Sequence, residues 1–296
     1  MQENLTVPVW DLYSAKAMAA EGSSPYDAVS LDEAEKRFWR GLWDTAVEDA
    51  VVDLGIDMVR FGPVAAAVVA EEPADLALNF ILGAAAPGAI EDGYLPAAVR
   101  WMERHDVDYR VPLLPDLPET DAAEEWLRRH RYRLTEGPAR LLRDGSPPQF
   151  QAPSGIDIYE RVDPWEDEGF GDPLAESLGF AYWGATFFFD LPGSDGWRCY
   201  CAVDGDEPLA YVAMSIHEEI AVLVLASRLV GERDGIGQSA VLHRCIADAS
   251  ASGCKTMAVA EAGSEPAVAD RESLTRAGFV EGFRTFTWQP RTRVPM

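Results

Sequence analysis

The sequence predicts an α+β fold built from two similar halves in tandem. Strands and helices follow one another through the second half, over about 153–290, and the same order of elements occurs earlier, over 31–146. A short internal repeat supports the match, because Asp121 to Tyr132 parallels Asp270 to Phe279 about half the chain later. With 296 residues and 48% hydrophobic content, the chain is large enough for two ordinary cores.

The most informative segment is a strand that runs into a turn with two glycines and then into a helix. The strand covers Ile220 to Ala226, the turn contains Gly235 and Gly237, and the helix extends through Ile246. Backbone N–H groups of such a turn and of the first helical turn point outward, at the positive end of the helix dipole. They form a place for a phosphate, and glycine lets a bulky anion approach the backbone. The alternative is that the glycines serve packing alone.

The elements around this turn follow in a regular order. Upstream, the pattern predicts a strand over 155–162, an interrupted helical region over 165–190, and a hairpin of 197–203 with 209–216 around the turn Asp204-Gly205. Downstream, it predicts a strand over 255–260, a helix that begins after Ser264 and ends at Gly278, and a closing strand over 282–288.

These residues resemble the GNAT N-acetyltransferase superfamily, whose pyrophosphate loop is written Q/R-x-x-G-x-G/A. Gly235 and Gly237 match that pattern. Glu232 stands where the family has Gln or Arg, and Asp234 is a second departure, so two carboxylates would repel a diphosphate. The resemblance covers a full domain over 153–290. It implies mixed, mostly antiparallel sheets flanked by helices, with one parallel pair of strands beside the loop.

The resemblance also implies acetyl-CoA, or another short acyl-CoA, as co-substrate. The diphosphate would lie on the loop, the pantetheine amides would pair with the preceding strand, and a nearby N–H would polarise the thioester carbonyl. The implied cofactor-binding residues are Leu225, Ala226, Ser227, Arg233, Asp234, Gly235, Ile236, Gly237, Gln238 and Ser239. No metal is implied.

Family members often place a glutamate on this strand or its neighbour as general base for the acceptor amine. Here Ala221 occupies that position, and Glu219, two residues earlier on the same face of the strand, is the candidate base. The alternative for Glu219 is an exposed turn carboxylate. Leu274 stands where many family members have a tyrosine that protonates the leaving thiolate, so that acid is absent or comes from elsewhere.

An aromatic stretch over 180–189 falls where the early helices of a GNAT domain wall the acceptor site. Tyr182, Trp183 and Phe187 are the candidate substrate-binding residues. The three successive phenylalanines of 187–189 cannot all face one core on a helix, so some must face a pocket or the other half. Packing between the halves and an acceptor wall both remain open.

The first half repeats the order of elements without the phosphate loop. A long helix near 31–54 precedes three strands, and the following turn over 83–88 lacks the G-x-G spacing. We interpret 1–146 as a degenerate GNAT-like domain and 153–296 as the acyl-CoA-binding domain. The boundary is predicted at Asp144 to Pro148, where Gly, Ser and Pro cluster. Chance similarity between the halves is the alternative.

The formal charge of −25 argues against a nucleic-acid partner, because phosphate contacts need a basic surface, and it favours a cationic substrate. Solubility alone also explains such acidity. No segment has the ~20 apolar residues of a membrane span and no signal sequence is recognised, so we expect a cytoplasmic protein with no membrane partner. The four cysteines and four histidines lack ligand spacing. The cysteines are expected to be reduced core thiols, and no metal site is expected.

Two functions are consistent with these observations. The first is an acyl-CoA-dependent N-acyltransferase that moves an acetyl group to the amine of a small, soluble, positively charged molecule. The second is a catalytically silent tandem protein that senses acyl-CoA or binds a partner, which the residues Glu232, Asp234, Ala221 and Leu274 together suggest. The sequence does not indicate an oligomeric state.

Overall fold

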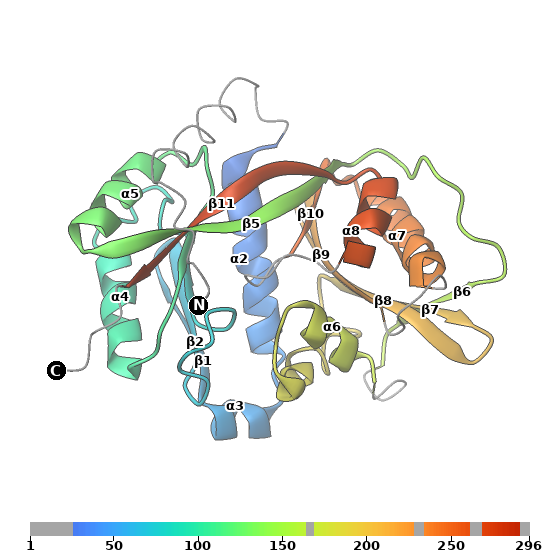
Figure 1. The fold of residues 1–296 in the computed structure, drawn as a ribbon, viewed down its shortest axis with the longest axis horizontal. Helices are drawn as coiled ribbons and strands as arrows, with labels where there is room; N and C mark the ends of the chain where they lie inside the picture. Colours follow the sequence, from blue (N-terminus) through green and yellow to red (C-terminus); the bar gives the residue numbers. More distant parts are fainter. Residues whose placement is uncertain (1–25, 164–168, 228–233, 261–267, 291–296) are drawn as a thin grey trace, which may run out of the picture.

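The computed structural model describes residues 26–163, 169–227, 234–260 and 268–290. Figure 1 shows two groups of strands on either side of the long helix α2. The helices are α2 (Ala28–Asp44), α3 (Glu48–Leu54), α4 (Tyr94–His105), α5 (Thr120–Arg129), α6 (Gly171–Ser177), the 3₁₀ helix η2 (Tyr182–Phe187), α7 (Asp234–Ala251) and α8 (Val268–Arg276). The strands are β1 (Ile56–Phe61), β2 (Val64–Val69), β3 (Phe80–Leu82), β4 (Val111–Leu113), β5 (Tyr132–Asp144), β6 (Asp157–Arg161), β7 (Trp197–Asp204), β8 (Glu207–His217), β9 (Ile220–Ser227), β10 (Thr256–Val259) and β11 (Val280–Pro290).

The strands form two sheets and confirm the α+β class with mixed, mostly antiparallel pairing. One sheet has the order β1-β2-β3, and the other has the order β4-β11-β5-β10-β9-β8-β7-β6. Among the described strands, β9 and β10 are the parallel pair within a sheet; β9 precedes the expected glycine loop and α7, and β10 follows them. A parallel bridge between Phe80 and Arg110 also connects β3 to the start of β4.

Strands β5 and β11 are shared between the halves. They form a long antiparallel pair that extends from Tyr132 opposite Pro290 to Leu142 opposite Val280. The end of β5 also pairs with β10 of the second half, and the end of β11 pairs with β4 of the first half. Each half therefore supplies its last strand to the sheet of the other, and Figure 1 shows the pair arching over both. The sheet crosses the predicted boundary, and the division into 1–146 and 153–296 stays a prediction.

A close approach of β5 and β11 marks the place where they pass between the halves. The register of the pair shifts between Arg284 and Phe286 of β11. Gly137 of β5 lies at that shift, and a Cβ on it would stand 2.7 Å from the carbonyl oxygen of Thr285. Because a bulge increases local twist, the register shift and Gly137 together let the β5–β11 pair turn from the strands of one half to the strands of the other.

Helix α2 packs against both halves. Its buried apolar residues repeat at helical spacing and include Leu31, Ala34, Phe38, Leu42 and Trp43. Phe38 lies 5.1 Å from the Trp197 ring of β7 between ring centroids, and Trp43 lies 4.6 Å from the Phe187 ring of η2. One hydrophobic core therefore extends from the first half into the second.

The sequence predicts one helix over 31–54, but the structure has two, α2 and α3. Thr45 follows the last turn of α2, and its hydroxyl lies 2.9 Å from the carbonyl oxygen of Gly41. The same hydroxyl lies 3.0 Å from the carbonyl oxygen of Phe187. Thr45 therefore attaches the end of α2 to the second half, and the chain turns there before α3 begins.

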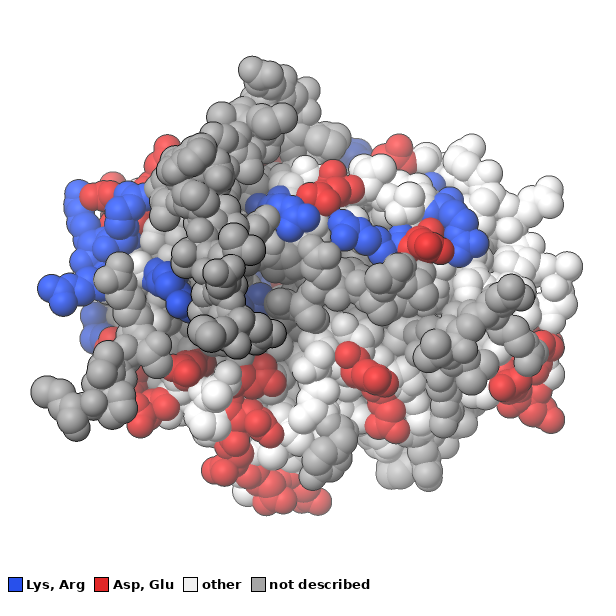
Figure 2. Space-filling model, in the orientation of Figure 1, with Lys and Arg blue, Asp and Glu red and all other residues white. Residues whose placement is uncertain are grey.

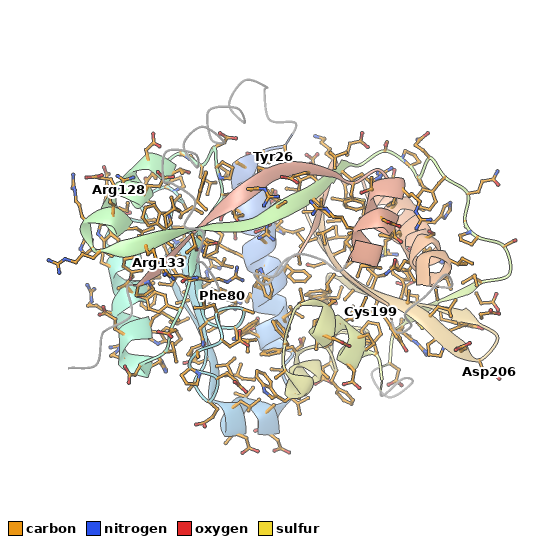
Figure 3. All side chains as sticks on the ribbon, in the orientation of Figure 1. Tyr26, Phe80, Arg128, Arg133, Cys199 and Asp206 are labelled. Carbon is orange, nitrogen blue, oxygen red and sulfur yellow. The ribbon has the colours of Figure 1, made fainter. Side chains whose placement is uncertain are left out.

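Helices α7 and α8 cover the opposite face of the second half. Their core with the sheet includes Tyr200, Leu223, Ile246 and Phe279. The predicted hairpin turn at Asp204-Gly205 joins β7 to β8, and Figure 3 shows Asp206 at its tip and Cys199 inside the half. All four cysteines are buried free thiols, as the sequence predicts.

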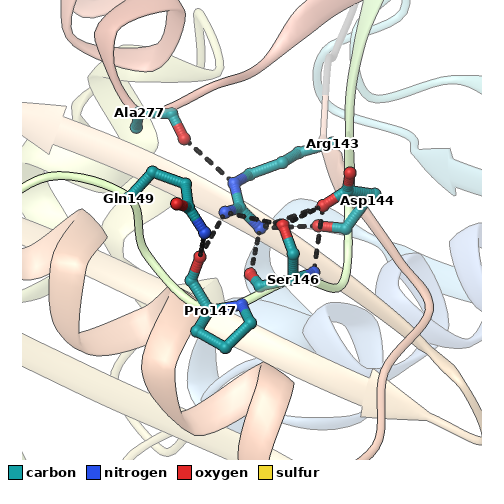
Figure 4. Close-up of polar contacts among 6 residues, drawn as sticks. All are labelled: Arg143, Asp144, Ser146, Pro147, Gln149 and Ala277. Atoms are coloured by element: carbon teal, nitrogen blue, oxygen red, sulfur yellow. Dashed lines mark hydrogen bonds and ion pairs between the residues drawn. The ribbon is translucent and has the colours of Figure 1, made fainter.

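A buried arginine, Arg143 of β5, holds the connection between the halves (Figure 4). Its guanidinium donates to the carbonyl oxygens of Ala277 at 2.9 Å, Asp144 at 2.6 Å, Ser146 at 2.7 Å and Pro147 at 3.1 Å. Ala277 follows α8, so one side chain joins the end of that helix to the segment that leaves β5. The predicted boundary region is therefore anchored to the second half.

Replacing Arg143 by methionine is expected to lower the free energy of unfolding by roughly 3–5 kcal/mol, because four carbonyl oxygens lose a shared charged donor. Urea unfolding measures the change. Arg129→Met is the matched control, since Arg129 is an exposed arginine of α5 and its loss is expected to cost about 0.5 kcal/mol or less. An effect of Arg143→Met as small as that of the control would contradict the anchoring role.

Candidate functional site

In the second half, β9 extends beyond the described end of its parallel partner β10. β9 pairs with β10 from Ile220 opposite Thr256 to Leu223 opposite Val259. The last link is the hydrogen bond from the Ala260 N–H to the Leu223 carbonyl oxygen, at 2.7 Å. β9 then continues to Ser227, paired with β8 on its other side, while no described residue pairs with its β10 side.

The open side of β9 presents backbone polar groups. Successive residues of a strand direct their N–H and C=O groups to alternate sides. Because the Leu223 carbonyl faces β10, the N–H and C=O of Leu225 face the gap beyond β10. The side chains of Leu225 and Ala226 are both buried, in the cores on the two faces of the sheet. Among the described residues this main-chain edge has no partner, and an extended molecule with amide groups has the matching donors and acceptors.

The start of helix α7 lies beside this open end. Gly237 packs on β8, since a Cβ there would stand 2.5 Å from the Leu209 Cβ and 3.4 Å from the Ala210 Cβ. Ala210 is the partner of Ser227 at the end of β9. The first N–H groups of α7 have no acceptor within the helix, and the dipole is positive there, so this end favours an anion.

A cation from α8 also reaches the start of α7. A Cβ on Gly235 would stand 3.0 Å from Nη2 of Arg276. Arg276 is exposed and its Nη2 lies 3.3 Å from the Ser273 hydroxyl oxygen, so its remaining donors can turn toward an anion. In the sequence, Arg276 is only a residue of the last turn of a predicted helix, with nothing to mark it as a ligand contact. Its position next to the glycines depends on how α8 packs against α7.

Comparison with solved structures identifies the fold. A GCN5-related N-acetyltransferase from Kribbella flavida is similar over 93% of this chain and 98% of its own, with a TM-score of 0.58 and 12% identity. A tandem GNAT protein from the clavulanic acid biosynthesis pathway is similar over 97% of this chain and 95% of its own length, with a TM-score of 0.52 and 16% identity. A GCN5-related N-acetyltransferase from Sphaerobacter thermophilus is similar over 79% of this chain and 78% of its own length, with a TM-score of 0.51 and 13% identity. The chain has the tandem GNAT fold. No protein-family model and no curated protein matches the sequence.

The other residues expected at the GNAT phosphate loop have mixed surroundings. Gln238 is fully buried and accepts a hydrogen bond from the Ser273 hydroxyl at 2.6 Å, so it faces α8. The Ser239 hydroxyl donates to the Gly235 carbonyl at 2.5 Å, whereas Ile236 is exposed. Arg233 lies outside the described residues, and for Ser227 and Asp234 the structure places the backbone only.

Glu219 lies at the other end of the GNAT strand β9, in the turn that precedes it. Its carboxylate forms an ion pair with Lys255 at 2.8 Å, and both side chains are more than half exposed. From Ile220 to Ser227 the strand extends by roughly 23 Å at ~3.3 Å per residue, so Glu219 is not brought near the start of α7. Its assignment as general base stays a hypothesis, and its surroundings are those of an exposed turn carboxylate.

The aromatic residues expected at the acceptor site lie between the halves. Phe187 is fully buried against Trp43. Trp183 is half-buried, and its indole N–H donates to Glu72 of the first half at 2.9 Å. Tyr182 begins η2, and its side chain lies outside the described part. The contacts of Phe187 and Trp183 are those of packing between the halves, and their role in binding an acceptor stays a prediction.

The first half of the GNAT fold has a corresponding turn, between β3 and α4, whose backbone groups are already bonded. The Ala86 N–H donates to the Gly83 carbonyl at 3.1 Å, and the Ala89 N–H donates to the Ala86 carbonyl at 3.0 Å. The Gly88 N–H donates to a carboxylate oxygen of Glu119 at 2.7 Å. A carboxylate of the chain itself therefore uses a donor that a phosphate would need, which supports the interpretation of this half as degenerate.

Acidic side chains gather along one edge of the face that Figure 2 shows. Figure 2 shows Asp and Glu along the lower edge of the face in view and Lys and Arg at its left end, over α4 and α5. Within the ranges that the structure describes, no group of three or more His, Cys, Asp or Glu residues is arranged to hold a metal ion. Of the helices described, none combines the length and the apolar character needed to cross a membrane.

The two loop glycines are expected to respond differently to a methyl group. Gly237→Ala is expected to lower the free energy of unfolding by roughly 1–3 kcal/mol, because the new Cβ meets the Cβ of Leu209 at 2.5 Å. Gly235→Ala is expected to change it by less than ~1 kcal/mol, because its neighbour is the flexible end of Arg276. Urea unfolding of both variants measures the difference. Equal losses would mean that Gly237 is not a packing glycine.

Proposed function

We propose that the second half binds an acyl-CoA, acetyl-CoA first, and that the chain transfers the acyl group to the amine of a small molecule. The observation that carries the proposal is the backbone edge of β9 that no described residue pairs with, which ends beside the start of α7 and Arg276. Pantetheine contains two amides and can pair with such an edge, and a diphosphate suits the positive end of a helix. Two proteins with the same fold are named N-acetyltransferases.

In this proposal the chain contributes mainly binding and orientation. The N–H and C=O of Leu225 pair with the pantetheine, and the first N–H groups of α7 together with Arg276 hold the diphosphate. The acceptor nitrogen attacks the thioester carbon, the C–S bond breaks, and CoA leaves as a thiolate. A backbone N–H beside the carbonyl oxygen stabilises the negative charge that develops there. The proton lost by the amine passes to water, since Glu219 lies at the other end of β9.

A silent acyl-CoA sensor is the second candidate function. Leu274 of α8 is almost fully buried, at the position where many GNAT enzymes have the tyrosine that protonates the thiolate. A buried leucine cannot supply that proton. A sensor would bind acyl-CoA at the same backbone edge without releasing CoA when amines are added, so binding and turnover must be measured separately.

Calorimetric titration with acetyl-CoA tests the binding step. Saturable binding is expected at one site per chain, because the donors of the first-half turn are already bonded. Arg276→Ala is expected to weaken binding about tenfold, the effect of losing one charged hydrogen bond to the diphosphate. Arg129→Ala, an exposed arginine of the first half, is the control and should bind normally. Failure to bind acetyl-CoA would remove both candidate functions.

Turnover with amines of different charge tests the acceptor class. The formal charge of −25 and the exposed Asp163 and Asp172 near the aromatic stretch motivate a cationic acceptor. With released CoA measured as thiol, spermidine is expected to react faster than aniline, which is neutral at pH 7. The rate with spermidine should fall as the salt concentration rises, because the electrostatic screening length decreases from ~10 Å at 0.1 M to ~3 Å at 1 M. A preference for aniline that is independent of salt would contradict the cationic class.

A further inference from the structure

A cavity of ≈ 300 Å³ lies between the two halves, away from the proposed acyl-CoA site. One face of α2 forms its floor, the β1–β2 hairpin forms one wall through Met58 and Arg60, and the ends of β7 and β8 form the other through Trp197 and His217. The start of α7 packs on Ala210, near the opposite end of β8. From Ala210 to His217 the strand advances seven steps of ~3.3 Å, or roughly 23 Å.

The lining of this cavity reverses the charge balance of the chain. The whole sequence has 50 Asp and Glu against 25 Lys and Arg. The cavity lining has four cations and three carboxylates. The cations are Lys36, Arg37, Arg40 and Arg60, and the carboxylates are Glu33, Asp44 and Asp195. Cations are therefore concentrated here relative to the rest of the protein, which is expected where an anion binds.

Lys36 is the fixed part of this lining. Its ammonium group lies 2.8 Å from Glu33, 3.1 Å from Asp32 and 3.2 Å from the carbonyl oxygen of Pro63, so its three N–H donors have partners. The side chain is only 10% exposed. Lys36 therefore joins α2 to the β1–β2 hairpin and is not itself available to a ligand.

The three arginines are held much more loosely. Arg37 lies 3.7 Å from Glu33, and Nη2 of Arg60 lies 3.5 Å from the carbonyl oxygen of Gly62. Arg40 pairs with Asp44 at 3.1 Å, but both side chains are more than half exposed, so water weakens that pair. Each guanidinium has five N–H donors, and most of them remain for an oxyanion.

The electrostatics of Glu33 agree with an excess of positive charge. Burial alone would raise the pKa of its carboxyl group. The hydrogen bond and charge of Lys36, with the charges of Arg60 and Arg37, outweigh burial and lower the pKa. Glu33 therefore stays ionised at neutral pH, and three cations surround that one carboxylate.

We propose that this cavity binds a small molecule with a carboxylate or phosphate group. Arg37, Arg40 and Arg60 hold the oxyanion, and Trp197 and Met58 contact an apolar part. The volume corresponds to about ten water molecules at ~30 Å³ each, the lower end of ligand pockets, so a metabolite fits and an acyl-CoA does not. Because both halves form the walls, the ligand bridges them and stabilises their arrangement. The proposal does not depend on the proposed acyltransferase function.

Titration of the ¹⁵N-labelled full chain tests the site directly. The probes are phenyl phosphate and benzoate, with inorganic phosphate to show whether the anion suffices and benzylamine as a cation of similar shape. The readout is the indole N–H signal of Trp197, identified by its loss in Trp197→Phe. Saturable shifts at millimolar phenyl phosphate or benzoate are expected, with no shift for benzylamine.

Variants separate this cavity from nonspecific binding. The double variant Arg37→Ala/Arg60→Ala is expected to weaken binding of the anion at least about tenfold. Both residues are exposed, so the fold is retained and the unchanged spectrum of the remaining indoles checks it. Arg129→Ala, which removes an equal charge from α5, should bind as the unmodified chain does. No Trp197 shift with either aromatic anion, equal binding of benzylamine, or equal loss in Arg129→Ala would each overturn the proposal.

Discussion

The reciprocal exchange of β5 and β11 is the constraint on which the rest of the structure depends. Each strand pairs with the other along its length and with a strand of the opposite half at one end. The halves cannot separate without breaking these backbone ladders. A buried ion pair at 2.9 Å between Arg140 of β5 and Glu35 fixes α2 against the exchanged strand. Such a pair contributes more to a defined position than to net stability, because removing two charges from water offsets their attraction.

The exchange also determines the geometry of the candidate site. β10 lies between β9 and β5, and its residues Thr256 to Ala258 pair with Asp144 to Leu142. A strand of the first half therefore pairs with β10 on one side, while β9 pairs with it on the other as far as Leu223 and then extends to Ser227. This arrangement fixes the position of β10 beside β9, and Arg143 anchors the end of β5 to the end of α8. The first half thus helps to position the strands of the proposed acyl-CoA site, although its own turn has bonded donors internally.

Local patterns in the sequence predict the elements well but not their long-range contacts. The Asp204-Gly205 hairpin, the strand before the glycine loop and the buried cysteines follow from alternation and turn residues, which act over a few positions. Strand exchange depends on backbone pairing between segments more than 100 residues apart, which periodicity does not record. The packing role of Gly237 and the place of Arg276 likewise need the contact of α7 with β8 and α8. Phe187 fits a core and a pocket wall equally until Trp43 is placed beside it.

The proposed acyl-CoA site consists mainly of main-chain groups, which helps to explain how the fold can be shared where sequence comparison finds no match. In the proposed site an acyl-CoA would contact the backbone edge of β9 and the first N–H groups of α7, and many different side chains can keep these two elements in place. The one charged contact argued for, Arg276, comes from a helix outside the loop pattern, so positive charge beside the diphosphate does not require a basic residue within the loop. Identity of 12–16% over nearly the whole chain is compatible with one fold for this reason. Recognition of an acceptor would depend on side chains instead, and these can differ between proteins of this fold at every position.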